Sequence, residues 1–169
     1  MDTFKNDEVL DYPNISKINF IKINKKYLKV LLINFFLFFV PLLVTLILLD
    51  LFAFNESVLK YRIIIYSSFF TFFVFIFLYI NFSFPLRRYA VREKDITYKS
   101  GLFIRKMTTV PFSRIQHVEI DESVFSRLFK LASISVFTAG DSSDDLVIKG
   151  LSKEKALQIK EFISTKVND

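Results

Sequence analysis

The sequence contains no cysteine and no tryptophan, and it has one histidine among its 169 residues. The absence of cysteine excludes disulfide bonds, thiolate chemistry and metal sites with cysteine ligands. A single histidine leaves little material for any other metal centre. Phosphate-binding loops, dinucleotide-binding fingerprints and zinc-binding helices are also missing. We therefore expect no catalytic residue, no cofactor and no metal.

Two long stretches of the chain lack any charged side chain: Val30–Leu49, with 20 residues, and Ile63–Leu86, with 24 residues. A helix of about 20 apolar residues crosses a hydrocarbon layer of about 30 Å, so each stretch is long enough to span a membrane. Only 13 residues connect them. The sequence therefore predicts a transmembrane helical hairpin over residues 30–86, with spans at about 28–49 and 63–85.

Positive charge lies on the side of the hairpin that holds both chain ends. Residues 13–29 contain five lysines and no acidic residue, and residues 87–94 contain four basic residues and one acidic residue. The connecting residues 50–62 carry two charges of each sign. Because basic residues stay on the cytoplasmic side, we expect a multi-pass protein with both termini in the cytoplasm. We interpret the net charge of +6 as a sign of interaction with a membrane surface, and we expect no nucleic acid partner.

Residues 1–29 are expected to form a basic cytoplasmic segment. Apolar and basic residues alternate directly before the first span, so Ile18, Phe20 and Ile21 would dip into the membrane interface while lysines reach anionic headgroups. The alternative is an ordinary basic flank of a membrane helix.

Each predicted span carries a small polar or kinked face. At 100° per residue, Asn34, Pro41 and Thr45 fall on one side of the first span. Polar residues in lipid tend to face a neighbouring helix, either within the hairpin or in another protein molecule. A transporter or channel is disfavoured because neither span contains a charged residue. The matching residues of the second span are Ser67, Ser68 and Thr71.

From residue 87 the pattern changes to short segments with the two-residue period of β-strands. A helix follows at the C-terminus, with Ser152 as its N-cap and Ala156, Ile159, Ile163 and Val167 on one apolar face. Residues 87–169 are therefore expected to be a small α+β, mainly β domain, with an antiparallel sheet first and a capping helix last. The expected strands are 88–92, 96–99, 105–110, 114–120, 134–138 and 146–149.

Several segments of this domain resemble a known family. The most specific is the run Pro-x-x-Arg-Ile-Gln-x-Val at residues 111–118, and residues 87–91, 95–101, 124–129 and 134–140 agree with it. The sequence resembles the bacterial pleckstrin-homology-like (PH-like) family and, within it, the short YdbS-like membrane proteins. One departure is Lys130, at a position where the family often has glycine.

The resemblance implies that the domain is PH-like, with a strongly bent antiparallel sheet closed by a C-terminal helix. It also implies that the protein lies in the bacterial inner membrane with this domain in the cytoplasm. It further implies a non-enzymatic protein that acts as a protein-binding or assembly module at the membrane. The alternatives are an anionic-lipid surface sensor and an accessory subunit of a transporter or membrane enzyme. The expected partners are membrane lipids and another membrane protein or a second copy of the chain.

Basic residues near the expected bilayer surface are the candidate lipid contacts. Such side chains gain about 1 kcal/mol each from anionic lipid without any specific pocket. The candidates are Lys22, Lys25, Lys26, Arg87, Arg88, Lys99, Arg105 and Lys106.

Two further features are interpreted as structural. His117 is expected on the polar face of a strand without a second positioned group, so a surface histidine is favoured over a catalytic one. Asp141, Asp144 and Asp145 lack the ligand order and central glycine of a calcium loop, so a solvated hairpin tip is favoured.

Overall fold

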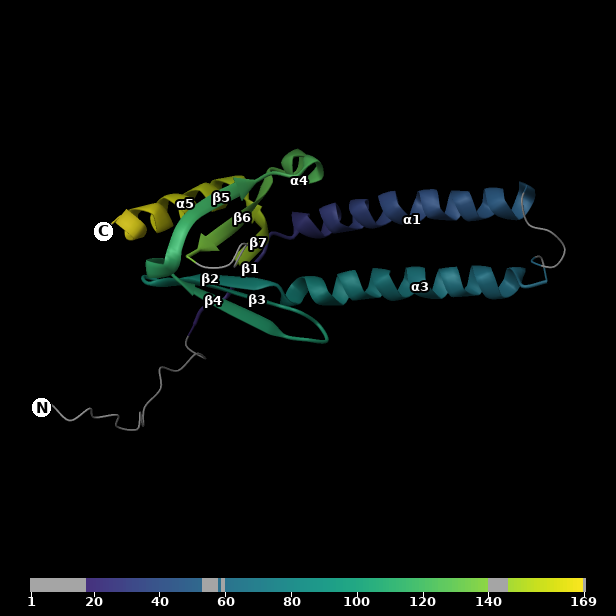
Figure 1. The fold of residues 1–169 in the computed structure, drawn as a ribbon, viewed down its shortest axis with the longest axis horizontal. Coiled ribbons are helices and arrows are strands. Elements are labelled where there is room, and N and C mark those ends of the chain that lie inside the picture. Colours follow the sequence, from purple (N-terminus) through teal and green to yellow (C-terminus); the bar gives the residue numbers. More distant parts are fainter. Residues whose placement is uncertain (1–17, 53–57, 59, 140–145, 169) are drawn as a thin grey trace, which may run out of the picture.

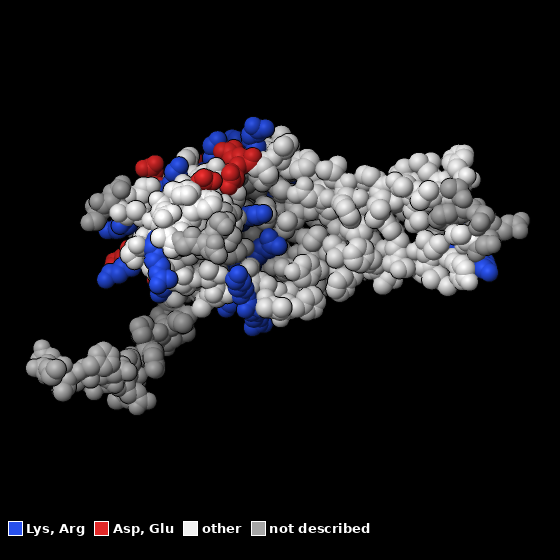
Figure 2. All heavy atoms as spheres, in the orientation of Figure 1, with Lys and Arg blue, Asp and Glu red and all other residues white. Residues whose placement is uncertain are grey.

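The computed structural model describes residues 18–52, 58, 60–139 and 146–168. A long two-helix hairpin extends from one end of a domain built of strands and two helices (Figure 1). The hairpin carries almost no charge, whereas the domain carries basic and acidic side chains over its surface (Figure 2).

The hairpin consists of α1 (Lys26–Phe52) and α3 (Arg62–Ser83), and a 3-10 turn at Phe84–Leu86 follows. Both helices are long and apolar enough to cross a membrane. Phenylalanine rings hold them together: Phe35 lies 4.8 Å from Phe73 between ring centroids, and Phe39 lies 5.3 Å from the same ring. Such edge and tilted contacts favour association of two helices that lipid surrounds on their other faces.

A polar contact closes the hairpin at the end remote from the domain. Arg62 Nε donates to Asp50 Oδ1 at 3.0 Å, and the Tyr66 hydroxyl donates to Asp50 Oδ2 at 3.3 Å. The ion pair therefore joins the last turns of α1 to the first turn of α3.

The first sheet has four antiparallel strands in the order β1-β2-β3-β4. Its longer members are β2 (Arg88–Val91), β3 (Asp95–Ser100) and β4 (Lys106–Pro111). The turn from β2 to β3 is held by a salt bridge between Arg92 and Asp95. These three strands match those expected from the sequence to within one or two residues.

The strand β1 (Ile21–Lys22) was not expected. It pairs antiparallel with β2, Ile21 opposite Tyr89 and Lys22 opposite Arg88. The whole membrane hairpin is therefore the connection between two neighbouring strands of one sheet. The division of the chain at residues 29 and 87 stays a prediction, but the domain takes its first strand from the segment that precedes the hairpin.

The second sheet contains β5 (Ile115–Asp121), β6 (Leu131–Thr138) and β7 (Leu146–Ser152) in that order. A 3-10 turn at Phe112–Arg114 redirects the chain from β4 into β5. The bend thus divides the strands into two antiparallel sheets. The expected fold class, a hairpin with a PH-like domain closed by a C-terminal helix, is confirmed.

The core lies between the two sheets and under α5 (Lys153–Asn168). Ser152 caps α5 as expected, since its hydroxyl accepts from Lys155 N at 3.4 Å. Ala156, Ile159 and Ile163 are fully or almost fully buried. Val167, in the last turn, is 39% exposed, so the expected apolar face of the helix ends one turn early.

A residue with an unusual backbone conformation, Lys130, follows the short helix α4 (Val124–Leu128). Lys130 has φ +56°, and no other described non-glycine residue has a positive φ. The left-handed conformation lets its N–H bond to Arg127 O at 3.1 Å and close the helix. Glycine would adopt this conformation without strain, whereas a lysine is strained by the left-handed φ.

Candidate functional site

Three basic side chains stand in a row across the first sheet, at the end of the strands next to the hairpin. Lys22 of β1 lies directly opposite Arg88 of β2, and Arg88 lies directly opposite Lys99 of β3. Directly opposed residues of an antiparallel sheet point to the same face, and like charges in such positions repel one another. All three are exposed. We call these three residues the cation row.

A shallow pocket of about 220 Å³ lies at the same end of the sheet. Arg88 and Lys99 of the cation row line it together with Arg105, which follows the turn after β3. Phe20 and Leu86 supply an apolar side, and the Lys99 ammonium lies 6.0 Å from the centre of the Phe20 ring. The pocket therefore combines three positive charges with an apolar wall.

These cations have no acidic partners in the part of the chain that the structure describes. The ion pairs among the described residues join Asp50 to Arg62, Arg92 to Asp95 and Glu122 to Lys153, and Glu119 lies beside His117. None of them includes the cation row or Arg105. An anion from outside the chain would relieve the repulsion within the row.

Three other predicted contacts, Lys25, Lys26 and Lys106, lie outside the cation row. Lys25 and Lys26 are exposed at the start of α1, where Asn24 Oδ1 accepts from Lys26 N at 3.0 Å and caps the helix. Lys106 pairs with Ser100. Because successive strand residues alternate between faces, its side chain lies on the other face of the sheet from that of Lys99.

Arg87 is half-buried, whereas Arg88 is exposed. The charge of Arg87 acts on the Tyr27 side chain at the base of α1, where it lowers the pKa that burial raises. Burial raises the pKa of the nearby Tyr98 hydroxyl, and the Arg87 charge and a hydrogen bond with Ser100 partly offset this rise. Arg87 thus joins the end of α3 to the base of α1 and to β3.

Sequence reasoning identified the basic residues but missed their arrangement. The cation row depends on β1, which has two residues and no recognisable strand pattern. The contributions of Phe20 and Tyr27 were missed for the same reason. The one available signal was the alternation of apolar and basic residues at 18–27, which is compatible with a strand as well as with an interfacial segment.

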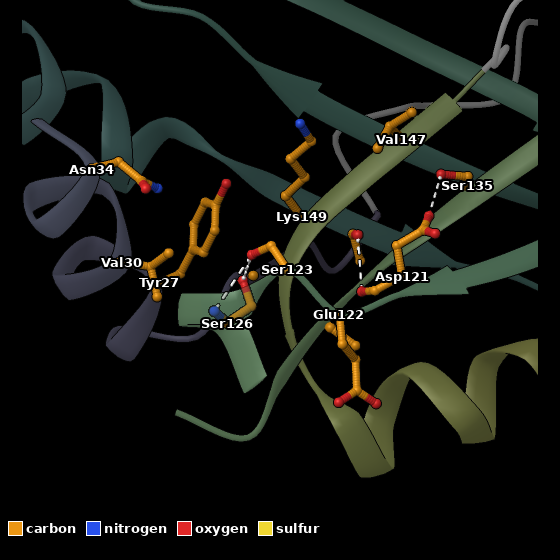
Figure 3. A pocket seen from close by; sticks show the side chains of 13 residues that line it. Tyr27, Val30, Asn34, Asp121, Glu122, Ser123, Ser126, Ser135, Val147 and Lys149 are labelled. Atoms are coloured by element: carbon orange, nitrogen blue, oxygen red, sulfur yellow. Dashed lines mark hydrogen bonds between the residues drawn. The ribbon is translucent and has the colours of Figure 1, made fainter. Parts of the chain in front are cut away.

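A second, larger cavity of about 620 Å³ lies between the base of α1 and the second sheet. Figure 3 shows Asn34 on one side of it and the carboxylates of Asp121 and Glu122 on the other. Both carboxylates have partners: Asp121 Oδ2 accepts from the Ser135 hydroxyl at 3.2 Å, and Glu122 pairs with Lys153 at 2.7 Å. Both carboxylates of this cavity are therefore already occupied by the protein itself, whereas its third charged side chain, Lys149, is in none of the ion pairs among the described residues.

His117 lies on the exposed face of β5. Its ring stacks on Phe137 at 4.3 Å between centroids, and its Nε2 is 3.6 Å from Glu119 Oε1. Within the described ranges, no group of three or more histidine, aspartate or glutamate residues is placed to hold a metal ion. The loop with Asp141, Asp144 and Asp145 lies outside the described residues.

The polar residues of the two spans do not form the contact between α1 and α3. They are exposed, and the interface consists of phenylalanine rings. Asn34 lines a groove of about 380 Å³ along the hairpin. The residues in question are Asn34, Pro41, Thr45, Ser67, Ser68 and Thr71.

Together, the hairpin, the two sheets and the capping helix define a membrane-anchored protein with a small PH-like domain. The family model of the bacterial PH domain matches residues 28–167, so the chain belongs to this family. The match begins in α1 and extends through the strands β2 to β7 into α5, and β1 precedes it.

Two relatives come from Bacillus subtilis (strain 168). The chain is 31% identical to the UPF0699 transmembrane protein YdbS over 77 residues, and this aligned stretch covers 46% of each protein. It is 28% identical to the UPF0699 transmembrane protein YdbT over 79 residues, and this aligned stretch covers 46% of this chain and 16% of YdbT. The chain thus aligns with less than half the length of these curated relatives, and no solved structure matches it. The resemblance to YdbS-like membrane proteins is confirmed.

Proposed function

We propose that the protein is a non-enzymatic binding module of the bacterial cytoplasmic membrane, whose domain binds anionic lipid headgroups of the cytoplasmic leaflet. The orientation rests on the lysines of residues 13–29 and the arginines that follow the second span. In this orientation the end of the domain next to the hairpin faces a negatively charged membrane surface.

The observation that carries this proposal is the cation row. Three opposed like charges without a carboxylate partner among the described residues destabilise the sheet edge unless an anion neutralises them. Arg88 and Lys99 also line the pocket of about 220 Å³. Guanidinium groups match phosphate oxygens in geometry, so Arg88 and Arg105 suit a phosphate-bearing headgroup.

The test removes the row and measures lipid preference in the full chain. The variant carries Lys22→Gln, Arg88→Gln and Lys99→Gln, and it is reconstituted in phosphatidylcholine with spin-labelled phosphatidylglycerol. Each cation near an anionic surface contributes about 1 kcal/mol to the free energy of lipid binding, and this corresponds to about a fivefold change in the association constant. We expect the preference for phosphatidylglycerol over labelled phosphatidylcholine to fall sharply.

A matched variant controls for net charge. Lys94→Gln, Lys160→Gln and Lys166→Gln remove the same charge from the part of the domain remote from the hairpin, where Lys94 and Lys166 line one hollow. This control is expected to keep the lipid preference of the unmodified chain. Equal preferences in the row variant and the control would contradict headgroup binding by the row.

A second candidate function is assembly with a further copy of the chain through the spans. The observation that favours it is the exposure of Thr45 on α1 and of Ser68 on α3. Polar residues in a span usually face another helix, and the hairpin does not supply one here. Because the chain has no cysteine, single-cysteine variants report this contact without background.

The assembly test uses Thr45→Cys and Ser68→Cys with oxidative cross-linking in native membranes, and Val40→Cys as the control. Val40 is an exposed apolar residue of α1, and at 100° per residue it lies about 140° around the helix from Thr45. Cross-linked dimers at the two polar positions and none at Val40→Cys would support self-assembly. A cross-link to a different membrane protein would instead indicate an accessory subunit, and no cross-link at all would contradict both forms of assembly.

A further inference from the structure

Among the described residues of 87–168, the four most exposed large apolar side chains lie in two places. Phe103, Ile104, Val124 and Leu128 are 74%, 84%, 65% and 74% exposed, more than any other large apolar side chain there. The first two lie at the tip between β3 and β4, and the other two lie on α4. Figure 1 shows both places at the end of the domain from which the hairpin leaves.

The tip between β3 and β4 lies beside α3. The ring of Phe103 stacks on Tyr79 of α3, with 5.9 Å between centroids and 11° between planes. Tyr79 precedes Leu86 by seven residues, which at 1.5 Å per residue places it about 10 Å inside the end of the apolar run. Phe103 is therefore at the depth of the spanning helix, not beyond its end.

A glycine fixes the shape of this tip. Gly101 has φ +107°, and a Cβ at this position would lie 1.8 Å from Ile104 O. Only glycine allows the chain to turn so tightly, and the turn leaves the side chains of Phe103 and Ile104 pointing away from the domain core. The exposure of the two side chains is thus part of the local fold.

The helix α4 lies beside α1, on the other side of the hairpin (Figure 1). Ser126 of α4 and Asn34 of α1 line the same cavity (Figure 3). Asn34 is the fifth residue of the first apolar run. Val124 and Leu128 are four residues apart and therefore share one face of α4.

Basic residues border both apolar places. Lys99, Arg105 and Lys106 flank the tip, and Arg127 and Lys130 flank the exposed face of α4; all five are exposed. Apolar side chains with Lys and Arg beside them are typical of segments that lie in the membrane interface, where the charged ends reach the headgroup layer.

We propose that the domain is seated on the bilayer by two apolar wedges, one on each side of the hairpin. The β3–β4 wedge consists of Phe103 and Ile104, and the α4 wedge consists of Val124 and Leu128. Both insert among the lipids of the leaflet next to the domain. This seating goes beyond anionic headgroup binding, because burial of apolar side chains requires no lipid charge.

The absence of tryptophan makes a direct test simple. The variants Phe103→Trp and Leu128→Trp each give the full chain one tryptophan at an exposed position, and Phe162→Trp serves as the control. Phe162 lies beside Glu93 and Lys94, at the turn between β2 and β3. Each variant is reconstituted in phosphatidylcholine alone, with and without bromine on the acyl chains, and quenching of tryptophan fluorescence is measured.

We expect brominated acyl chains to remove most of the emission of Phe103→Trp and Leu128→Trp and little of that of Phe162→Trp. Quenching at one wedge position but not at the other would overturn the two-sided seating. Quenching no greater than in the control would overturn it entirely. Because these vesicles contain no anionic lipid, the result is independent of whether the cation row binds headgroups.

Discussion

Substitution of Gly150 by alanine is expected to loosen the base of α1 from the domain. Gly150 lies in β7 with φ +82°, and a Cβ there would lie 2.5 Å from Cγ and 2.7 Å from Cδ1 of Tyr27. The same glycine accepts a hydrogen bond from Asn24 N at 2.8 Å. The strand and the start of the first span therefore approach each other as closely as a glycine permits.

The expected cost has two parts. A non-glycine residue at a positive φ is strained by about 1–3 kcal/mol. Displacement of the buried Tyr27 ring adds an overpacking cost of about 1–3 kcal/mol. We therefore expect Gly150→Ala to lower the free energy of unfolding of the domain by about 4 kcal/mol, a large fraction of the stability of a small domain.

The measurement is a urea titration of the full chain in nanodiscs, with a Phe162→Trp reporter in every variant. Tyr27→Ala provides the second arm of a double-mutant cycle, because it removes the ring atoms that the new methyl group would meet. In this background Gly150→Ala should cost only the backbone strain of about 1–3 kcal/mol. An equal cost in both backgrounds would refute the proposed contact, and a cost below about 1 kcal/mol would refute the strain as well.

Three further outcomes are expected. Lys130→Gly should raise the free energy of unfolding by about 1 kcal/mol in the same titration, since it removes a strained left-handed residue. Phe35→Ala should lower the free energy of helix–helix association in the hairpin by about 1 kcal/mol, because lipid replaces only part of the lost ring packing, and the SDS fraction at which the hairpin unfolds should fall accordingly. Burial raises the pKa values of Tyr89 and Tyr98. The unfolded chain therefore loses these protons first, and the urea midpoint should fall as the pH rises above about 10 and stay unchanged by tyrosine ionisation below it.

The elements that the sequence predicted well are those with a long or regular pattern. The charge-free runs gave the hairpin, because desolvation of a charged group in lipid is costly enough to keep such groups out of a span. The two-residue period gave the strands, with β6 longer than expected because Leu131 and Ala132 also pair with β7. Ser152 as the cap of α5 followed from its side-chain chemistry.

The elements that the sequence could not predict depend on contacts between distant segments. A strand of two residues has no period, so β1 becomes visible only through its pairing with β2 across the inserted hairpin. The cation row depends on the register of three strands, and a shift of one residue would place Lys99 on the other face. Phe103 and Ile104 read as ordinary strand-end residues until the stacking on Tyr79 gives their depth.

The insertion of the hairpin between β1 and β2 bears on how the domain meets the membrane. A domain at the end of a flexible linker can turn any face to the bilayer, with a reach set by the linker length. Here Asn24, two residues before α1, donates from its N–H to Gly150 O at 2.8 Å, and Arg87, directly before β2, accepts at its carbonyl oxygen from Ile23 N at 3.5 Å. Both ends of the hairpin are thus tied to the domain within a few residues. The domain cannot rotate relative to the hairpin without breaking these contacts, so the end of the domain that carries the cation row and the two proposed wedges is held next to the apolar helices.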